Sequence, residues 1–280
     1  MKMIELAKTG EKISILGQGT WGLKGRILFI YPRASEYYEQ WKSSLRKGIE
    51  LGMNHIDTAE VYGWGVAEKT IGEIVGEYKR DDLFITTKLL PIHLRHNGSK
   101  KAAYNSLKRL GLESVDLYLI HFRNPFSSLR KQMRILEELV DEGKTRYIGV
   151  SNFSVEQFKK AQSYLKKYEL VNNQVRANVL HQGHIHESLP FYQEEGITMT
   201  AYSPLGHTGF KGLTGEIRDK LEKIAESHGA TIQQIAIAWL INHKNVIAIP
   251  KAFKTEHMEA NARSAGIRLR QDEINLLSAN

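Results

Sequence analysis

Four residues of the types that carry protons and charge lie at comparable places in the first half of the chain. Asp57, Lys88 and His121 each end a run rich in β-forming residues, and Tyr62 lies one short loop beyond Asp57. Each has a structural explanation when taken alone, because Asp57 can cap a turn, Lys88 can be a solvated strand end, and His121 can be a satisfied polar group. Their recurrence at three successive strand ends favours a single reactive site.

The composition limits the chemistry of such a site. The chain of 280 residues has no cysteine, which excludes disulfides, thiolate catalysis and cysteine-ligated metals. The net charge is +8, but basic and acidic residues are interspersed, as in 216-EIRDKLEKIAE-226, so no nucleic-acid partner is expected. The longest apolar runs are far shorter than a bilayer span and the N-terminus lacks a signal-peptide core, so we expect no membrane partner and a cytoplasmic protein.

The elements that position these residues alternate along the chain, β-rich runs with segments whose apolar residues recur every three or four positions. The predicted strands are 15–19, 53–58, 83–88, 115–121, 146–150, 171–175, 197–202 and 246–250. Eight strands that alternate with helices, with no linker between them, predict an α/β fold of one domain, residues 1–280, built as a (β/α)₈ TIM barrel. An open doubly wound sheet is the alternative.

Local signals mark the ends of several elements. Two S/T-x-x-Q capping boxes predict helices that begin after Ser154 and Thr231. The segment 2–14 is expected to form a β-hairpin that closes the N-terminal end of the barrel. The segment 271–280 is expected to be an extra C-terminal helix.

The stretch 15-ILGQGTWGL-23 contains the order G-x-G-x-x-G, which is typical of dinucleotide-binding Rossmann folds. That motif requires its third glycine to open a helix that holds the pyrophosphate. Here Gly22 is followed by another glycine, an apolar run and a proline, and a helix is expected only near Ser35. The context therefore argues against the Rossmann motif, and the glycines are expected to let a strand end turn tightly beneath the site.

The order of motifs along nearly the whole chain resembles that of the aldo-keto reductases, which are NAD(P)H-dependent carbonyl reductases built on this barrel. The matching segments are LGQGTWG, HIDTAEVYG, FITTK, VDLYLIH, RYIGVSNF, NNQV, TAYSPLG and AIPKA. The resemblance implies an oxidoreductase that reduces aldehydes or ketones to alcohols with NADPH and without a metal. It also implies that Asp57, Tyr62, Lys88 and His121 form the catalytic tetrad.

The chemistry of this reaction suggests a role for each member of the tetrad. Hydride addition to a carbonyl builds negative charge on the oxygen, so the site must donate a proton and stabilise that charge. We expect Tyr62 to be the general acid, with the Lys88 cation lowering its pKa from ~10. Asp57 would hold Lys88 charged and oriented, and His121 would hydrogen-bond the carbonyl oxygen.

The resemblance also implies which residues contact the cofactor. They are Gly19 and Thr20 beneath the nicotinamide, Ser151, Asn152 and Gln174 on its carboxamide, Tyr202 stacked on its ring, Ser203 and Leu205 over the pyrophosphate, Lys251 on the 2′-phosphate and Asn261 on the adenine. His257, Ala252 and Ala260 stand where arginine, serine and glutamate are usual, and Lys254 could replace part of the missing charge. We therefore expect NADPH to be preferred, with NADH also usable.

The substrate side is less well defined. Trp21 matches a pocket-lining tryptophan, and Phe122 stands where tryptophan is frequent. The apolar run 26–31 would form either a wall over the substrate or a packed loop or dimer contact, so a monomer or a weak homo-oligomer is expected. The chain ends at Asn280, directly after its last predicted helix, so we expect no tail over the pocket and a more open site.

Three histidines, His181, His184 and His186, raise the question of a metal site. No cysteine or H-E-x-x-H pattern accompanies them, and the segment reads as a polar loop that enters a helix, so no metal is expected.

Two other functions remain compatible with the tetrad. One is a nucleotide-sensing regulatory subunit with little turnover, although the long N-terminal extension that inactivates channels is not found here. The other is a barrel isomerase or lyase that handles phosphorylated substrates and uses Lys88 as a Schiff-base nucleophile.

Overall fold

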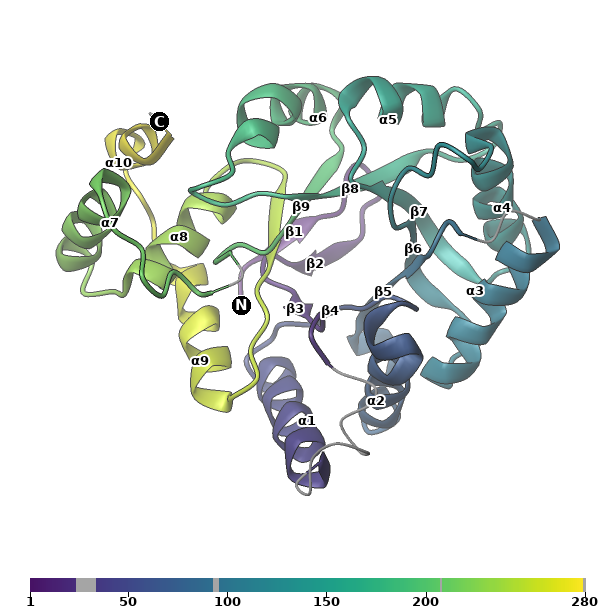
Figure 1. Cartoon of the computed structure of the whole chain (residues 1–280), viewed down its shortest axis with the longest axis horizontal. Helices are drawn as coiled ribbons and strands as arrows, with labels where there is room; N and C mark the ends of the chain where they lie inside the picture. Colours follow the sequence, from purple (N-terminus) through teal and green to yellow (C-terminus); the bar gives the residue numbers. More distant parts are fainter. Residues whose placement is uncertain (24–33, 93–95, 207, 279–280) are drawn as a thin grey trace.

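Eight parallel strands form the centre of the molecule. The computed structural model describes residues 1–23, 34–92, 96–206 and 208–278, and strands β3 to β10 pair in sequence order around a barrel (Figure 1). They are β3 Gln18–Gly19, β4 His55–Asp57, β5 Phe84–Leu89, β6 Val115–Ile120, β7 Thr145–Ser151, β8 Leu170–Arg176, β9 Thr198–Tyr202 and β10 Val246–Ile249. The predicted barrel is confirmed, and the open doubly wound sheet is wrong.

The barrel closes between its first and last strands. Leu16 forms a parallel bridge with Ala248, and the Gly17 N–H donates to the Ala248 carbonyl at 2.9 Å. The Gly19 N–H donates to the Pro250 carbonyl at 3.2 Å. We call these contacts the closing seam. The predicted strand 15–19 is therefore only partly regular, because its first residues make a bridge rather than a ladder.

The seam explains two of the glycines in the G-x-G-x-x-G stretch. A Cβ on Gly17 would lie 2.7 Å from Nδ1 of His55, and a Cβ on Gly19 would lie 2.7 Å from the carbonyl oxygen of Ile249. The next described helix begins only at Ala34. These glycines therefore allow close strand packing and do not open a phosphate-binding helix.

Helices surround the barrel. They are α1 Ala34–Glu50, α2 Val66–Val75, α3 His96–Leu110, α4 Leu129–Asp141, α5 Val155–Gln162, α6 Leu189–Glu195, α7 Glu216–Ser227, α8 Ile232–Ile241, α9 Thr255–Arg263 and α10 Gln271–Ser278. Both capping boxes form as predicted, at Ser154 and Thr231. The extra helix α10 is also as predicted, and it packs beside α7, which lies outside the strand–helix alternation (Figure 1).

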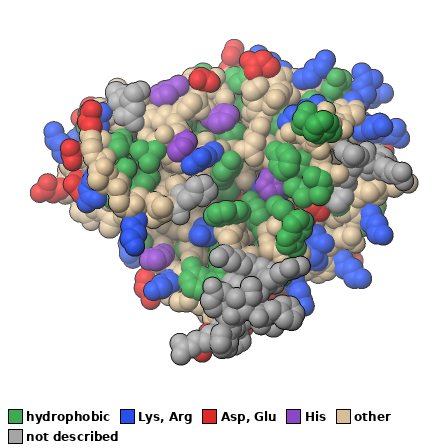
Figure 2. Space-filling view, in the orientation of Figure 1, with side chains coloured by type: hydrophobic (Ala, Val, Ile, Leu, Met, Phe, Trp, Pro, Cys, Tyr) green, Lys and Arg blue, Asp and Glu red, His purple; other side chains and the backbone are tan. Residues whose placement is uncertain are grey.

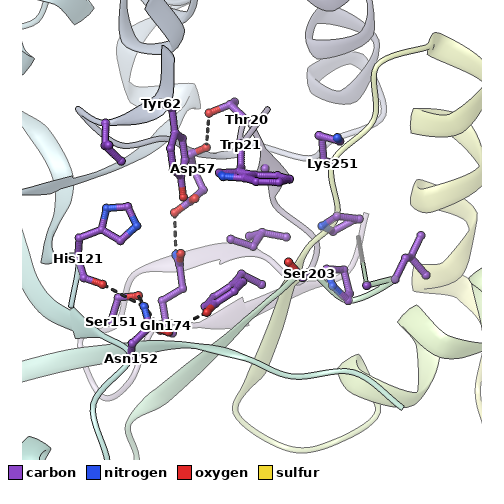
Figure 3. A pocket seen from close by; sticks show the side chains of 18 of the residues that line it. Thr20, Trp21, Asp57, Tyr62, His121, Ser151, Asn152, Gln174, Ser203 and Lys251 are labelled. Carbon is purple, nitrogen blue, oxygen red and sulfur yellow. Dashed lines mark hydrogen bonds between the residues drawn. The ribbon is translucent and has the colours of Figure 1, made fainter. Parts of the chain in front are cut away.

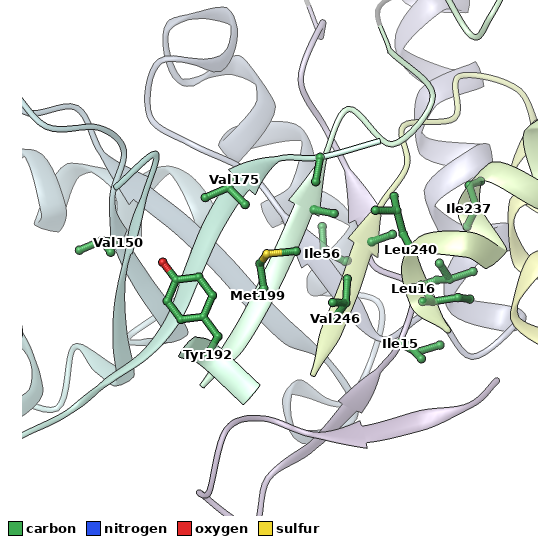
Figure 4. Packing of buried hydrophobic residues seen from close by; sticks show 14 of the residues in the cluster. Ile15, Leu16, Ile56, Val150, Val175, Tyr192, Met199, Ile237, Leu240 and Val246 are labelled. Carbon is green, nitrogen blue, oxygen red and sulfur yellow. The ribbon is translucent and has the colours of Figure 1, made fainter. Parts of the chain in front are cut away.

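The main apolar core lies between the barrel and the helices. Outward-facing strand residues such as Ile56, Val150 and Val175 are buried there (Figure 4). Ile237 and Leu240 of α8 belong to the same cluster. Because both faces of these strands are covered, their sequences read as nearly continuous apolar runs.

The N-terminal hairpin plugs the amino end of the barrel. Strand β1, Met3–Glu5, pairs antiparallel with β2, Lys12–Ser14. Leu6 and Ile13 are buried against inward-facing strand residues. Those residues are Phe84, Leu117, Leu119, Val171 and Ile247. The predicted hairpin is thus confirmed, and this layer, here named the apolar plug, forms the floor beneath the polar site.

The outer surface carries both signs of charge. On the face seen in Figure 2, acidic and basic side chains lie around the periphery, and hydrophobic side chains gather near the middle. No helix among the described residues has both the length and the apolar character needed to cross a membrane.

Candidate active site

A cavity of about 450 Å³ opens at the carboxyl ends of the strands. The predicted site residues that line it are Gly19, Thr20, Trp21, Asp57, Tyr62, His121, Phe122, Ser151, Asn152, Gln174, Tyr202, Ser203, Leu205 and Lys251 (Figure 3). Lys88 is not part of the lining because it is fully buried, and Asn261 lies in α9, also outside it. The fold thus brings residues from both halves of the chain to one cavity.

Lys88 is held below the cavity by short hydrogen bonds. Its Nζ donates to Oδ1 of Asp57 at 2.6 Å and to the Thr58 carbonyl at 2.8 Å, and it lies 3.5 Å from the Tyr62 hydroxyl. Burial lowers the pKa of Lys88, and the charge of Asp57 opposes that shift. Because the ammonium has no exposed surface, it has no access to a substrate, which argues against Lys88 as a Schiff-base nucleophile.

Tyr62 keeps its proton in this state. Burial raises the pKa of Tyr62 well above its usual 10.0, and the charge of Asp57 and the neighbouring Tyr202 add to the shift. Burial therefore outweighs the lowering of this pKa that was expected from the Lys88 ammonium. At neutral pH the side chain is a phenol, which can donate a hydrogen bond to an oxygen in the cavity.

His121 presents a neutral imidazole beside that phenol. Burial and the Lys88 charge lower the pKa of His121 to about 3. Its ring centre lies 5.7 Å from that of Tyr62, with the planes at 80°. Its backbone N–H is fixed by the Leu89 carbonyl at 3.0 Å. A neutral ring has one N–H to donate, so His121 can orient a polar ligand without competing for the proton.

A hydrogen-bond network links the opposite wall to Asp57. Gln174 Nε2 donates to Asp57 Oδ2 at 2.7 Å, and Ser151 Oγ donates to the Gln174 carbonyl at 2.8 Å. Asn152 Nδ2 donates to Ser151 Oγ at 3.0 Å, and the Tyr202 hydroxyl donates to Asn152 Oδ1 at 2.8 Å (Figure 3). The residues expected to bind the carboxamide are therefore held in fixed orientations by one another.

Two residues of this wall have left-handed backbones. Asn152 has φ 61° and Ser203 has φ 51°, a conformation that is uncommon outside glycine. The Asn152 N–H is held by the Gln174 carbonyl at 2.9 Å, and the Ser203 carbonyl accepts from Asn178 Nδ2, also at 2.9 Å. Strain of this kind persists only where surrounding contacts impose it, and here it lies in the cavity wall.

The far end of the cavity suits an anionic nucleotide. The Lys251 ammonium lies 5.6 Å from the ring centre of Trp21. Nδ2 of Asn261 is buried and has no hydrogen-bond partner among the described residues. A buried donor without an acceptor is costly unless a ligand completes it. A cation at the cavity mouth therefore fits a phosphate of a dinucleotide, and the unsatisfied amide of α9 has a donor left for its base.

The residues near Lys251 that differ from the usual aldo-keto reductase pattern differ in their exposure. Lys254 and His257 are exposed next to and within the first turn of α9, whereas Ala252 is buried. Helix N-termini favour anions, so the Lys254 cation strengthens the attraction for an anion that the start of α9 already provides.

Comparison with known proteins agrees with this geometry. The model of the Aldo/keto reductase family matches residues 15–279. The chain belongs to the aldo/keto reductase family. Methylglyoxal reductase YeaE of Escherichia coli is 32% identical to it over 99% of this chain and 93% of its own length.

Solved structures give the same result. The thermostable aldo-keto reductase Tm1743, in complex with the inhibitor epalrestat, has a TM-score of 0.91 and 42% identity over 100% of this chain and 99% of its own. An aldo-keto reductase from Klebsiella pneumoniae in complex with NADPH has a TM-score of 0.86 and 30% identity over 99% and 94% of the two chains.

In this aldo/keto reductase the remaining cavity wall is largely apolar. Trp21 is 54% exposed and Phe122 is 36% exposed at the mouth. Val61 and Leu90 also line the cavity, although the sequence analysis did not single them out. Each lies close in sequence to a predicted catalytic residue, which is the one signal that could have identified it. The predicted wall at 26–31 lies outside the described residues.

The three histidines of this aldo/keto reductase do not converge. His181, His184 and His186 each make a hydrogen bond within their own segment, at 3.0 to 3.3 Å. Across the described ranges of the chain, no group of three or more His, Cys, Asp or Glu is placed to hold a metal ion.

Proposed function

We propose that this protein reduces the carbonyl group of aldehydes or ketones to an alcohol, with NADPH as the hydride donor. The observation that carries the proposal is the buried Lys88–Asp57 pair beneath a phenol and a neutral imidazole that face one cavity. The family of the chain and the NADPH complex of its Klebsiella relative support the same chemistry.

The residues of the site act on the substrate oxygen. NADPH, when bound, supplies the hydride and hence both electrons of the reduction. The Tyr62 hydroxyl donates a hydrogen bond to the carbonyl oxygen and transfers its proton as negative charge develops there. The neutral His121 ring donates a second hydrogen bond and orients that oxygen.

Lys88 stabilises Tyr62 after the proton has left. The resulting phenolate would lie 3.5 Å from the ammonium, which has no exposed surface. A charge pair at that distance is worth far more in a buried site than in water. Asp57 holds the ammonium in place, and its second oxygen is fixed by Gln174.

We further propose that Lys251 selects NADPH over NADH by binding the 2′-phosphate, with Asn261 on the adenine. Ser151, Asn152 and Gln174 would hold the carboxamide against Tyr202, above Gly19 and Thr20, and Ser203 and Leu205 would cover the pyrophosphate. Residues 1–280 would act as one domain in the cytoplasm. The protein would be a monomer or a weak homo-oligomer, and light scattering after gel filtration can test this oligomeric state.

A cofactor-oxidation screen tests the proposed function. Absorbance of NADPH should fall when the protein is mixed with short and aromatic aldehydes and with methylglyoxal, the compound in the name of the Escherichia coli relative. The same panel with NADH should give lower kcat/KM. Tight NADPH binding without oxidation by any carbonyl compound would instead favour the nucleotide-sensing subunit.

A further inference from the structure

The turn that carries Tyr62 has an unusual backbone. Gly63, Trp64 and Gly65 follow one another with φ of 60°, 56° and 90°. This left-handed region is unfavourable for a residue such as tryptophan. The Trp64 side chain is 78% exposed, so its own packing does not hold the turn in place. Contacts behind the turn must do so.

Arg109 of α3 occupies the space behind Gly65. A Cβ on Gly65 would lie 2.5 Å from Cδ and 2.7 Å from Nε of Arg109. That Nε donates to Oε2 of Glu68 at 2.6 Å, and the same guanidinium donates to Ser106 Oγ at 3.0 Å. Since α2 packs against α3, the bond to Glu68 of α2 and the bond to Ser106 of its own helix hold the arginine behind the turn (Figure 1).

Glu68 connects this arginine to the strand that carries Lys88. Glu68, in the first turn of α2, is fully buried, and its other oxygen accepts from Thr87 Oγ1 at 2.6 Å. Neighbouring residues of a strand point to opposite faces, so Thr87 faces the helices while Lys88 faces the barrel interior. A buried carboxylate with both oxygens bonded is a rigid anchor. Strand, helix and turn are thus held together by one network.

We propose that Arg109 is a positioning residue for carbonyl reduction. Held by Glu68, it fixes the turn 63–65 and thereby the place of the Tyr62 hydroxyl. The inference rests on the proposed function, in which that hydroxyl donates the proton. Misplacement of a reacting group by about 1 Å can cost roughly a hundredfold in rate.

The test is Arg109→Met, which keeps an unbranched stem and removes the guanidinium. We expect kcat to fall about ten- to a hundredfold, with KM and the NADPH Kd changed by no more than about twofold. Hydrogen exchange of the peptide 59–66 should become faster. Arg109→Lys, which restores a cation beside Glu68, should recover part of kcat. A kcat within about twofold of wild type, with only a lower Tm, would overturn the inference.

Arg80→Met is the control, and in it Asp116 keeps a second cation, Arg146, at 3.0 Å. Arg80 is 30% exposed and donates at 2.6 Å to the buried Asp116, and Arg109 is 30% exposed and donates at 2.6 Å to the buried Glu68. The control pair lies at the start of β5 and β6, near the apolar plug. We expect Arg80→Met to lower Tm and leave kcat unchanged. An equal loss of kcat in both variants would mean that the effect of Arg109 is general destabilisation.

Gly65→Ala supplies a second, independent test. In the wild-type background the new Cβ meets Arg109 and also strains a backbone with φ of 90°, so kcat should fall; in an Arg109→Ala background only the strain remains, so the further loss should be smaller. Additive losses would contradict the contact.

The exchange measurement also separates two failures. Unchanged exchange in Arg109→Met, with normal wild-type turnover, overturns this inference alone, whereas faster exchange with no wild-type turnover overturns the proposed function.

Discussion

The two ends of the barrel place a buried ion pair in opposite surroundings. Each end holds a buried carboxylate paired with a cation, Asp116 with Arg80 and Asp57 with Lys88, both at 2.6 Å. At the amino end Asp116 also accepts from the Ile85 N–H at 2.7 Å, beside an apolar plug. At the carboxyl end the pair faces a cavity of about 450 Å³.

The difference shows what each pair is for. A carboxylate with its partners complete, next to close-packed apolar side chains, contributes to stability and has nothing left to offer a ligand. Beside the Asp57–Lys88 pair, His121 lines the cavity, and its Nδ1 still lacks a partner among the described residues. In barrels of this type the amino end serves stability and the carboxyl end serves function. The following experiments test that division.

The largest effect is expected at the open end. Tyr62→Phe removes only the proposed proton donor, so kcat for carbonyl reduction should fall about a thousandfold. Tm and the Kd of NADPH, measured by thermal melting and fluorescence titration, should stay near the wild-type values. Turnover close to wild type would remove Tyr62 from the role of general acid.

The plug should show the opposite pattern. Leu6→Ala leaves a cavity among fully buried residues and should lower the free energy of unfolding by about 2–5 kcal/mol, measured by urea denaturation. At a temperature where the variant stays folded, kcat/KM should equal that of wild type. A selective loss of kcat would mean that the two ends are coupled, and the comparison would fail.

Cofactor selection should respond more weakly. Lys251→Ala removes one charged contact, worth about 1.5–3 kcal/mol, so the Kd of NADPH should rise about ten- to a hundredfold. The Kd of NADH should barely change, because NADH has no 2′-phosphate. Lys254→Ala should raise the Kd of NADPH less, because this exposed cation is expected to replace only part of the missing charge. Equal losses for both cofactors in Lys251→Ala would contradict the assignment.

Mild acid should have the smallest effect and should act through stability. Burial lowers the pKa of His55 to about 4 from 6.5, so the unfolded chain binds the extra proton between those values. Stability is therefore complete above pH 6.5 and falls as the pH drops toward 4, by about 1 kcal/mol at pH 6. Melts from pH 7 to 5 measure the slope, and His55→Gln should reduce it; His121, whose pKa is also lowered, accounts for part of the slope that remains. Because His121 stays neutral, kcat of the folded enzyme should not show a His121 titration in this range.

The barrel could be predicted from the sequence because the signals for its strands and for its helices are both local. Strands covered on both faces read as continuous apolar runs, and capping boxes such as the one at Ser154 mark helix starts. The tetrad followed from the same regularity, since Asp57, Lys88 and His121 come at strand ends. Once the alternation of strands and helices was identified, it followed that these three residues meet at one end of the barrel.

Properties that depend on the surroundings were not predictable in this way. The pKa of Tyr62 is raised chiefly by burial, which no spacing encodes, and this outweighs the lowering expected from Lys88. The support of Gly65 by Arg109 joins residues of different helices, and nothing in either local pattern indicates it. Helix α7 carries an ordinary amphipathic pattern, so its place outside the alternation became clear only in three dimensions.

The closing seam has a consequence for the synthesis of the chain. Leu16 and Gly17 pair with Ala248, so the edge of the first strand has no partner until the more than 200 residues between them have been synthesised. Contacts this distant in sequence form late, because the intervening chain must be ordered first. Gly19 on one side of the seam and Lys251 on the other belong to the same cavity. A growing chain therefore cannot complete this cavity before residues 248–251 have been synthesised.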